Sequence, residues 1–167
     1  DEKGEWTTGR PVGGVVTPAN EGAGTLSPDG RFIIFTACAG MEGEYGAGRK
    51  GLGSCDLFIS RRIGNRWSPP ENLGPPVNSR NWESQPSLAS DGRTLYYVRG
   101  TQAQDGLKDM DIYVTRLQED GSFSAPEKLG SAINTPFQEE SVQIHPDGRT
   151  LYFSSNGHPA FGGLDIY

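Results

Sequence analysis

Three segments of this 167-residue chain repeat one pattern in the same order, and this repeat constrains the fold more than any other feature. In each segment a Glu lies eight residues before an Asp-Gly-Arg sequence, which leads into a β-branched and aromatic run. A later Asp opens a second short apolar run. The repeated carboxylates are Glu21, Glu83 and Glu139, then Asp29, Asp91 and Asp147 of the Asp-Gly pairs, then Asp56, Asp111 and Asp165.

Each repeat predicts four short antiparallel strands. The Asp-Gly pair favours a hairpin turn between the first two strands, because Gly adopts a positive φ without steric strain. The aromatic residue near the end of a repeat, Trp67 or Phe123, predicts the fourth strand, and Trp6 begins a weaker copy. The predicted second strands are 32–36, 95–98 and 151–154, and the predicted third strands are 57–60 and 112–115. Four strands in each repeat predict an all-β fold, a β-propeller built from four-stranded blades.

The chain has the length of a single domain, and its 24 Gly and 12 Pro argue against long helices. The landmarks divide it into a fourth strand with a linker (1–20), two blades (21–82 and 83–138) and an incomplete blade (139–167). About three blades are fewer than the 4–8 of known propellers. We therefore expect either part of a larger propeller or a homodimer of half-propellers that closes a six-bladed ring.

Charge and motif content exclude several function classes. With 21 acidic and 15 basic residues the net charge is −6, which argues against nucleic-acid binding. No apolar run reaches the ~20 residues of a membrane span. The chain contains no Gly-x-Ser-x-Gly, His-Glu-x-x-His or dinucleotide-binding motif. We therefore expect a non-enzymatic protein without a cofactor.

The repeated carboxylates have a structural and a functional interpretation. Residues that recur in every blade are best explained by folding, with each carboxylate accepting hydrogen bonds from loop amides. The alternative is a carboxylate ring that binds Ca²⁺, which takes 6–8 oxygen ligands. No Asp-x-Asp-x-Asp-Gly loop supports a dedicated calcium site, so the structural interpretation is preferred and no metal site is assigned.

The two cysteines lie in one blade only. Cys38 ends a predicted second strand and Cys55 begins the third strand of the same hairpin, so a disulfide would close the Gly-rich loop 39–54. Closing about 15 residues contributes on the order of 3 kcal/mol. Free buried thiols are the alternative. A disulfide would indicate the periplasm, the cell surface or the exterior.

Features confined to one blade are the candidates for binding. The Gly-rich loop is the longest connection, and 100–109 and 156–163 are expected to lie on the same face. Trp6, Trp67 and Phe123 recur and are expected in the core. The candidate contact residues are Met41, Tyr45, Arg49, Lys50 and Leu52 of the loop, together with Trp82 and His158.

The motifs resemble a known repeat family. Ser-Pro-Asp-Gly-Arg at 27–31, His-Pro-Asp-Gly-Arg at 145–149 and the Asp-Ile-Tyr strands resemble the TolB-type WD40-like propeller repeat. The linkers Asn-Leu-Gly-Pro-Pro-Val-Asn and Lys-Leu-Gly-Ser-Ala-Ile-Asn-Thr are similar to those of Bacteroidetes envelope propellers that also carry an OmpA-like peptidoglycan-binding domain. The PorE component of the type IX secretion system is of this kind.

The resemblance implies a scaffold of the bacterial envelope, periplasmic, outer-membrane associated or secreted, that binds envelope proteins. Attachment to peptidoglycan through other domains would place it in a secretion complex. Two alternatives are a propeller that accompanies a serine peptidase or other hydrolase, and a propeller that binds glycans.

Overall fold

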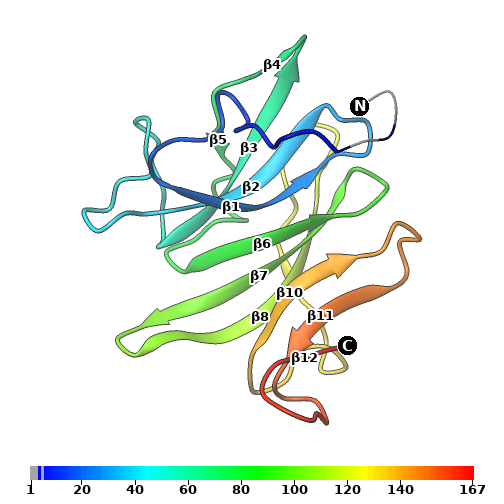
Figure 1. Cartoon of the computed structure of the whole chain (residues 1–167). Helices are drawn as coiled ribbons and strands as arrows, with labels where there is room; N and C mark the ends of the chain where they lie inside the picture. Colours follow the sequence, from blue (N-terminus) through cyan, green and yellow to red (C-terminus); the bar gives the residue numbers. More distant parts are fainter. Residues whose placement is uncertain (1–3, 5) are drawn as a thin grey trace.

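The structure, a computed structural model, describes residue 4 and residues 6–167, and these residues form strands and no helix. The prediction of an all-β chain is confirmed. Figure 1 shows three groups of strands that follow one another along the chain, with the two termini at the first and third groups. We call these groups units 1, 2 and 3.

Unit 1 is an antiparallel sheet in which β1 pairs with β2 and β2 with β3, and both later strands, β4 and β5, pair with β3. Its outer strand is short, because the chain first forms a small hairpin on β3 before it returns to the sheet. The strands are β1 (Asn20–Leu26), β2 (Phe32–Cys38), β3 (Cys55–Ile63), β4 (Arg66–Trp67) and β5 (Glu71–Asn72).

Units 2 and 3 repeat this order. Unit 2 contains β6 (Trp82–Leu88), β7 (Thr94–Ala103), β8 (Gly106–Arg116) and β9 (Glu127–Lys128), whereas unit 3 contains β10 (Glu139–Ile144), β11 (Leu151–Ser155) and β12 (Asp165–Ile166). A single parallel bridge between Cys55 and Trp82 joins units 1 and 2 into one extended sheet. Unit 3 forms a separate sheet.

The Asp-Gly turns form as predicted. Gly30, Gly92 and Gly148 have φ values of 69°, 67° and 68°, the left-handed region that Gly adopts most readily. Several hydrogen bonds hold each turn; in the third, Gly148 N–H donates to the His145 carbonyl and the Asp147 carboxylate accepts from the Arg149 amide at 2.8 Å.

The Asp147 turn predicts an acid-sensitive contribution to stability. Hydrogen bonds from the Arg149 and Thr150 amides, and then from the Thr150 hydroxyl, hold the pKa of Asp147 well below its ordinary value of 3.8. A carboxyl group whose pKa is lower in the folded than in the unfolded chain contributes its full stabilisation at pH values above the unfolded-state pKa. This stabilisation is lost as the pH falls through the folded-state pKa. We expect Asp147→Ala to reduce the loss of thermal stability below about pH 4. The measurement is the unfolding midpoint between pH 2 and 7, with the exposed Asp105→Ala as control; identical acid profiles for Asp147→Ala and the parent would contradict it.

A β-bulge recurs two residues after each repeated Glu. Ala23, Gln85 and Ser141 all have positive φ values, at 41°, 55° and 56°, and the strand register shifts at each of them. Because a bulge turns backbone groups out of the ladder, these positions can bond to a neighbouring unit.

The inner strands of adjacent units are joined by side chain–backbone hydrogen bonds. Leu88 N–H of β6 donates to Thr25 Oγ1 of β1 at 3.1 Å, and Ile144 N–H of β10 donates to Ser87 Oγ of β6 at 3.0 Å. β6 therefore contacts both β1 and β10. The same contact is made twice, from unit 1 to unit 2 and from unit 2 to unit 3.

The core lies largely between units rather than inside one sheet. One buried cluster joins Ile34 and Leu57 of unit 1 to Leu95 and Tyr97 of unit 2. A second joins Val98, Met110 and Ile112 of unit 2 to residues of unit 3. Burial of one unit's sheet therefore depends on its neighbour.

Linker asparagines hold each unit to the next. Asn78 accepts from the Leu57 amide at 2.9 Å and donates to the Leu57 carbonyl at 2.8 Å, and Asn134 repeats both bonds with Ile112. Both asparagines are buried.

Three sequence expectations need correction. The segment 100–109 is not a loop but the tip of the β7–β8 hairpin, in which Thr101 pairs with Lys108. The fourth strand does begin at the aromatic, since Trp67 pairs with Arg62 and Phe123 is bridged to Leu117, but a second short strand, β5 or β9, pairs with the third strand four residues further on. Trp6 is not in the core: it is fully exposed, and the described residues between 4 and 19 form no strand. The rest of the predicted strand-and-linker segment, residues 1–3 and 5, lies outside the described residues.

Candidate functional site: a stapled loop at one end of the units

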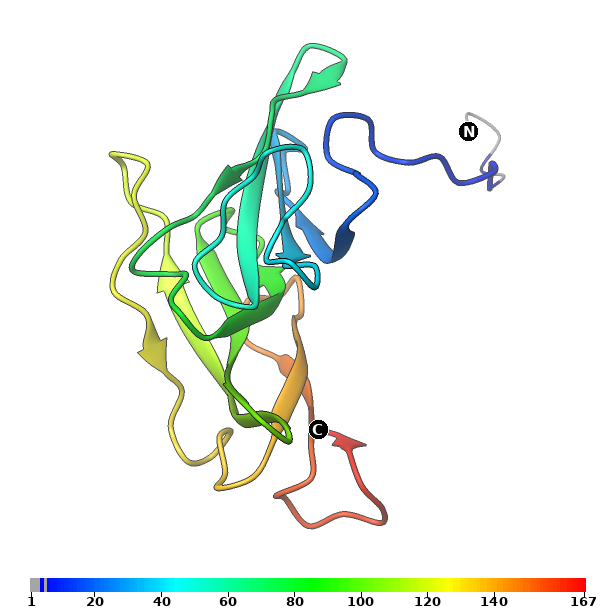
Figure 2. The same ribbon diagram turned by 90° about the vertical axis from the view of Figure 1, so that its left-hand side faces the viewer.

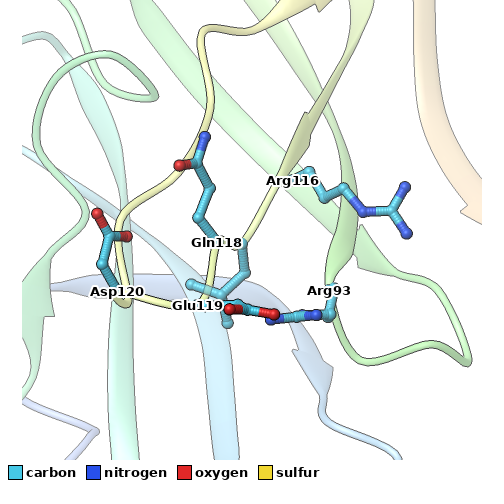
Figure 3. A pocket seen from close by; sticks show the side chains of 6 residues that line it. Arg93, Arg116, Gln118, Glu119 and Asp120 are labelled. Atoms are coloured by element: carbon cyan, nitrogen blue, oxygen red, sulfur yellow. The ribbon is translucent and has the colours of Figure 1, made fainter.

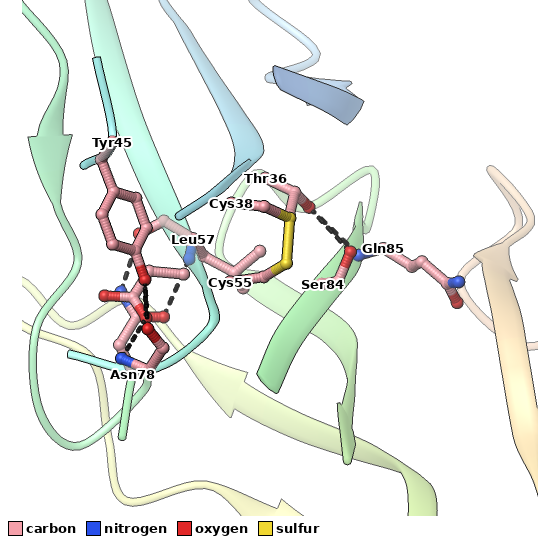
Figure 4. Close-up of a disulfide and its surroundings, with 10 residues drawn as sticks. Thr36, Cys38, Tyr45, Cys55, Leu57, Asn78, Ser84 and Gln85 are labelled. Atoms are coloured by element: carbon pink, nitrogen blue, oxygen red, sulfur yellow. Dashed lines mark hydrogen bonds between the residues drawn. A yellow bond between two sulfur atoms is a disulfide. The ribbon is translucent and has the colours of Figure 1, made fainter. Parts of the chain in front are cut away.

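The predicted disulfide is present. Cys38 and Cys55 are register partners at the ends of β2 and β3, with Cα atoms 3.9 Å apart, and their sulfur atoms are bonded (Figure 4). The antiparallel pairing of the hairpin brings the two residues together. The bond closes the loop 39–54 at its base, and such bonds persist in oxidising compartments.

The loop is also held from inside by Asp56. Its carboxylate accepts from the amides of Leu52 and Gly53 at 2.7 and 3.1 Å. The Tyr45 hydroxyl donates to the Gly53 carbonyl at 2.6 Å and lies 3.4 Å from the Asp56 carboxylate. Burial, and then the Asp56 charge, raise the pKa of the Tyr45 hydroxyl, so it stays protonated as a donor. In Figure 4 the Tyr45 ring points into the protein beside Asn78.

A buried Arg ties the loop to the preceding linker. Arg49 pairs with Glu21, donates to the Val15 carbonyl at 3.2 Å, and lies over the rings of Phe35 and Phe58 at 5.9 and 5.8 Å. Its Nε and Nη1 atoms have no hydrogen-bond acceptor. The two aromatic faces supply the remaining stabilisation of the charge.

In the other two units a different basic residue takes the place of Arg49, next to the linker carbonyl and the aromatic rings. In unit 2, Arg99 of β7 pairs with Glu83 at 2.8 Å, donates to the Val77 carbonyl and lies over the rings of Tyr97 and Tyr113. In unit 3, His158 Nε2 lies 2.9 Å from the Ile133 carbonyl, and its ring packs against Phe153 and Tyr167. We call this position the basic site of each unit.

The basic site could have been found from spacing. Arg49 lies seven residues before Asp56, and His158 lies seven residues before Asp165. In unit 2 the β7–β8 hairpin leaves no such loop, and Arg99 comes from the strand. The corresponding strand positions in units 1 and 3 hold Ala37 and Ser155, as their pairing with Glu21 and Glu139 shows. A small residue on the strand thus accompanies a basic residue in the loop.

The repeated glutamates fix the linkers. Each accepts hydrogen bonds from the amide and the hydroxyl of a residue four positions earlier: Thr17 for Glu21, Ser79 for Glu83 and Thr135 for Glu139. Asp165 accepts from the amides of Phe161 and Gly162 as Asp56 does from its own loop. Asp111, which has no such loop, pairs instead with Lys128 at 2.7 Å. Among the described residues no group of three or more Asp, Glu, His and Cys is arranged to hold a metal ion.

Only part of the predicted contact set is accessible. The Met41 side chain is fully exposed, at 106%, and Lys50 and Leu52 of the same loop are also exposed. Tyr45 and Arg49, in contrast, are not exposed contact residues, because both side chains are buried in the supporting contacts described above, although Arg49 also lines a pocket beside the loop. His158 is half-buried in the basic site of unit 3, which likewise gives it a supporting role.

Trp82 lies at the base of the loop. It is half-buried, contacts the unit 2–unit 3 core, and is bridged to Cys55. Asn81, the residue before Trp82, accepts a hydrogen bond from the loop: Ser54 N–H donates to the Asn81 carbonyl at 3.2 Å. Loop 39–54 and linker 79–82 thus lie side by side at this end of the units, and Figure 2 shows the backbone of this end from the side.

A pocket of about 360 Å³ lies beside the loop tip. Ala47, Gly48 and Arg49 line one side, and Trp67, Pro69 and Pro70 line the other. Another pocket, of about 460 Å³, lies at the opposite, turn-bearing end and is lined by Arg93, Arg116 and the 117–120 turn. In Figure 3 the Gln118, Asp120 and Arg116 side chains point in different directions, so the lining residues do not converge on one point.

The chain was compared with known proteins. No protein-family model matches it, and no curated protein matches it. Within the part of the chain that the structure describes, no helix has the length and apolar character needed to cross a membrane.

Proposed function

We propose that this chain is part of a β-propeller scaffold of the bacterial envelope, without catalytic activity, that binds protein partners through the end of the units carrying loop 39–54. The propeller arrangement is supported by three units of one strand order whose inner strands contact in sequence. The envelope location is supported by the disulfide, together with the resemblance of the repeats.

The observation that carries the proposal is that the loop has a fixed base and interior but an exposed apolar side chain. Its base is closed by a disulfide, and Tyr45, Arg49 and Asp56 hold its interior, whereas Met41 is fully exposed. An ordered loop loses little conformational entropy on binding, so its exposed side chains can bind a partner at low cost. Methionine is flexible and polarisable, which suits it to contacts with another protein.

The neighbouring pocket suits an apolar side chain of the partner. Its Trp and Pro residues form an apolar wall, and it opens beside the Gly48 backbone. A partner that contacts Met41 and Leu52 could fill this pocket with an aliphatic or aromatic residue.

The test is capture of partners from a detergent-solubilised bacterial envelope extract by the immobilised chain after chemical cross-linking. Met41→Asp is expected to reduce the captured partner at least tenfold, because a charge at the centre of a contact is desolvated without a counterion. Ile63→Asp, a change at another exposed apolar residue on the distant β3–β4 hairpin, should capture as the parent does. Equal capture by all three chains would overturn the choice of this loop.

A further inference from the structure

Two adjoining pockets lie on unit 1 and share Trp67. One is the pocket of about 360 Å³ beside the tip of loop 39–54, and the other has a volume of about 580 Å³. Trp67 and Gly14 line both pockets. Segment 10–14 and the hairpin residues 65–67 bound the larger one. We call the two pockets together the Trp67 groove.

The wall of the groove that precedes β1 is bonded to unit 1. Val15 N–H donates to the Val12 carbonyl at 3.1 Å and forms a turn, and the Val15 carbonyl accepts from Arg49 at 3.2 Å. Gly14 lies against Trp67, since a Cβ atom at this position would be 3.3 Å from the Trp67 carbonyl oxygen. Its φ of 85° also favours Gly. The groove is therefore bounded on both sides by backbone in fixed contacts.

The charged residues of the groove are all basic. Among the described residues that line it are Arg10, Arg49 and Arg66 and no Asp or Glu, although the net charge of the chain is −6. The pocket of about 460 Å³ at the turn-bearing end, in contrast, includes Glu119 and Asp120 beside its arginines. A pocket of about 290 Å³ at the first two Asp-Gly turns includes both of their aspartates. The Trp67 groove thus has the charge that suits an anionic ligand.

Two of the three arginines are accessible to a ligand. Arg49 is buried and paired with Glu21, whereas Arg10 and Arg66 are exposed. Within residue 4 and residues 6–167, neither Arg10 nor Arg66 forms an ion pair. A carboxylate of a ligand at Arg10 or Arg66 would therefore displace no carboxylate of the described residues.

The part of the groove beside the loop tip is largely apolar. Pro69 and Pro70 follow Trp67 along one wall, and Ala47 and Gly48 contribute to the lining without a long side chain. Aromatic and proline surfaces of this kind bind the apolar side chains of an extended peptide. An apolar subsite thus lies next to a cationic one.

An acidic peptide segment has both properties that the groove requires. Its carboxylates match Arg10 and Arg66, and an aliphatic or aromatic side chain matches the surface of Trp67 and the prolines. An anionic polysaccharide supplies the charge but no apolar side chain. The net charge of the chain disfavours nucleic acid.

We propose that the Trp67 groove binds an acidic peptide segment of the partner, in which Asp or Glu residues lie next to an aliphatic or aromatic residue. The carboxylates pair with Arg10 and Arg66, and the apolar side chain packs against Trp67 and the adjacent prolines. This inference rests on the proposed function, because it specifies the chemistry of the partner.

The experiment is selection of random peptides displayed on phage against the immobilised chain. Peptides that bind the parent are expected to be enriched in Asp and Glu beside Leu, Phe or Trp. Their affinity should fall at least tenfold when NaCl is raised from about 50 to about 500 mM, because salt screens exposed charges. Enrichment of neutral or basic peptides, or recovery of no binding peptide, overturns the proposal.

Charge-matched variants test where the selected peptides bind. The double substitution Arg10→Glu and Arg66→Glu should weaken binding at least tenfold with unchanged circular dichroism, because it replaces attraction by repulsion at two exposed residues. The control is Arg93→Glu with Arg149→Glu, the same charge change at two exposed arginines of the Asp-Gly-Arg turns, and it should bind within twofold of the parent. Equal losses in the two double variants, or no loss in the first, overturn the assignment of the groove.

Two further measurements separate this result from its alternatives. Polygalacturonate, an anionic polysaccharide, should bind at least tenfold more weakly than the selected peptides; stronger binding that depends on Arg10 and Arg66 would make the groove a polysaccharide site and overturn the proposal. Met41 lines neither pocket, so Met41→Asp should bind the peptides as the parent does. Because the selection needs no natural partner, failure of peptide binding overturns the groove alone, whereas equal partner capture by Met41→Asp overturns the loop.

Discussion

Replacing Glu83 with alanine is expected to destabilise the chain by about 3–5 kcal/mol, because removal of one partner leaves the other charge of a buried pair uncompensated. The Glu83 side chain is wholly buried, and it accepts from Arg99 Nε at 2.8 Å and from the Ser79 amide at 3.0 Å. The substitution would leave the guanidinium over the Tyr97 and Tyr113 rings without its carboxylate and would release the linker. The measurement is the free energy of unfolding from urea titration.

Glu71→Ala is the matched control. Glu71 also pairs with an Arg, at 3.0 Å from Arg61, but both of these side chains are at least half exposed. Exposed pairs contribute about 0–1 kcal/mol. A similar loss of stability in the two variants would contradict the assignment of Glu83 as a buried support of the linker.

The second large effect is expected on removal of the disulfide. The Cys38→Ala and Cys55→Ala double substitution should lower stability by about 3 kcal/mol, since it frees a loop of roughly 15 residues in the unfolded chain. A domain of this size loses about 2–4 °C per kcal/mol, so the unfolding midpoint should fall by roughly 10 °C. Differential scanning calorimetry measures the shift.

Loss of the disulfide should affect partner binding by the loop less than it affects the stability of the fold. Tyr45, Asp56 and Arg49 hold it without the disulfide, so the double variant should keep part of its partner binding at temperatures below the midpoint. Treatment of the parent with a reductant should reproduce the shift. An unchanged midpoint in both experiments would show that the loop is already constrained in the unfolded chain.

The sequence predicted the strands and turns well where local chemistry repeats. Gly30, Gly92 and Gly148 each require a positive φ, and the runs after them are β-branched and aromatic, so hairpins at these places need little tertiary information. The disulfide was predictable because two strands of one hairpin bring Cys38 and Cys55 into register.

The sequence predicted poorly where a residue's role depends on distant neighbours. Tyr45 and Arg49 belong to a polar, Gly-rich loop, which suggests exposure, yet contacts with Gly53 and Glu21 bury them. Trp6 has the pattern of a core residue but has no sheet of the described chain beside it. The extension of β7 and β8 over 100–109 depends on pairing between polar residues, which periodicity does not reveal.

The basic site has a consequence for how the loops of this fold can diverge. Either the strand, as with Arg99, or the loop, as with Arg49 and His158, can supply the group that bonds the linker carbonyl. A connection can therefore be shortened to a hairpin, or lengthened and altered in composition, while the bond to the linker carbonyl is kept. The surface of the loop can in this way vary separately from the support beneath it, and one unit can acquire a new loop while its neighbours are unchanged.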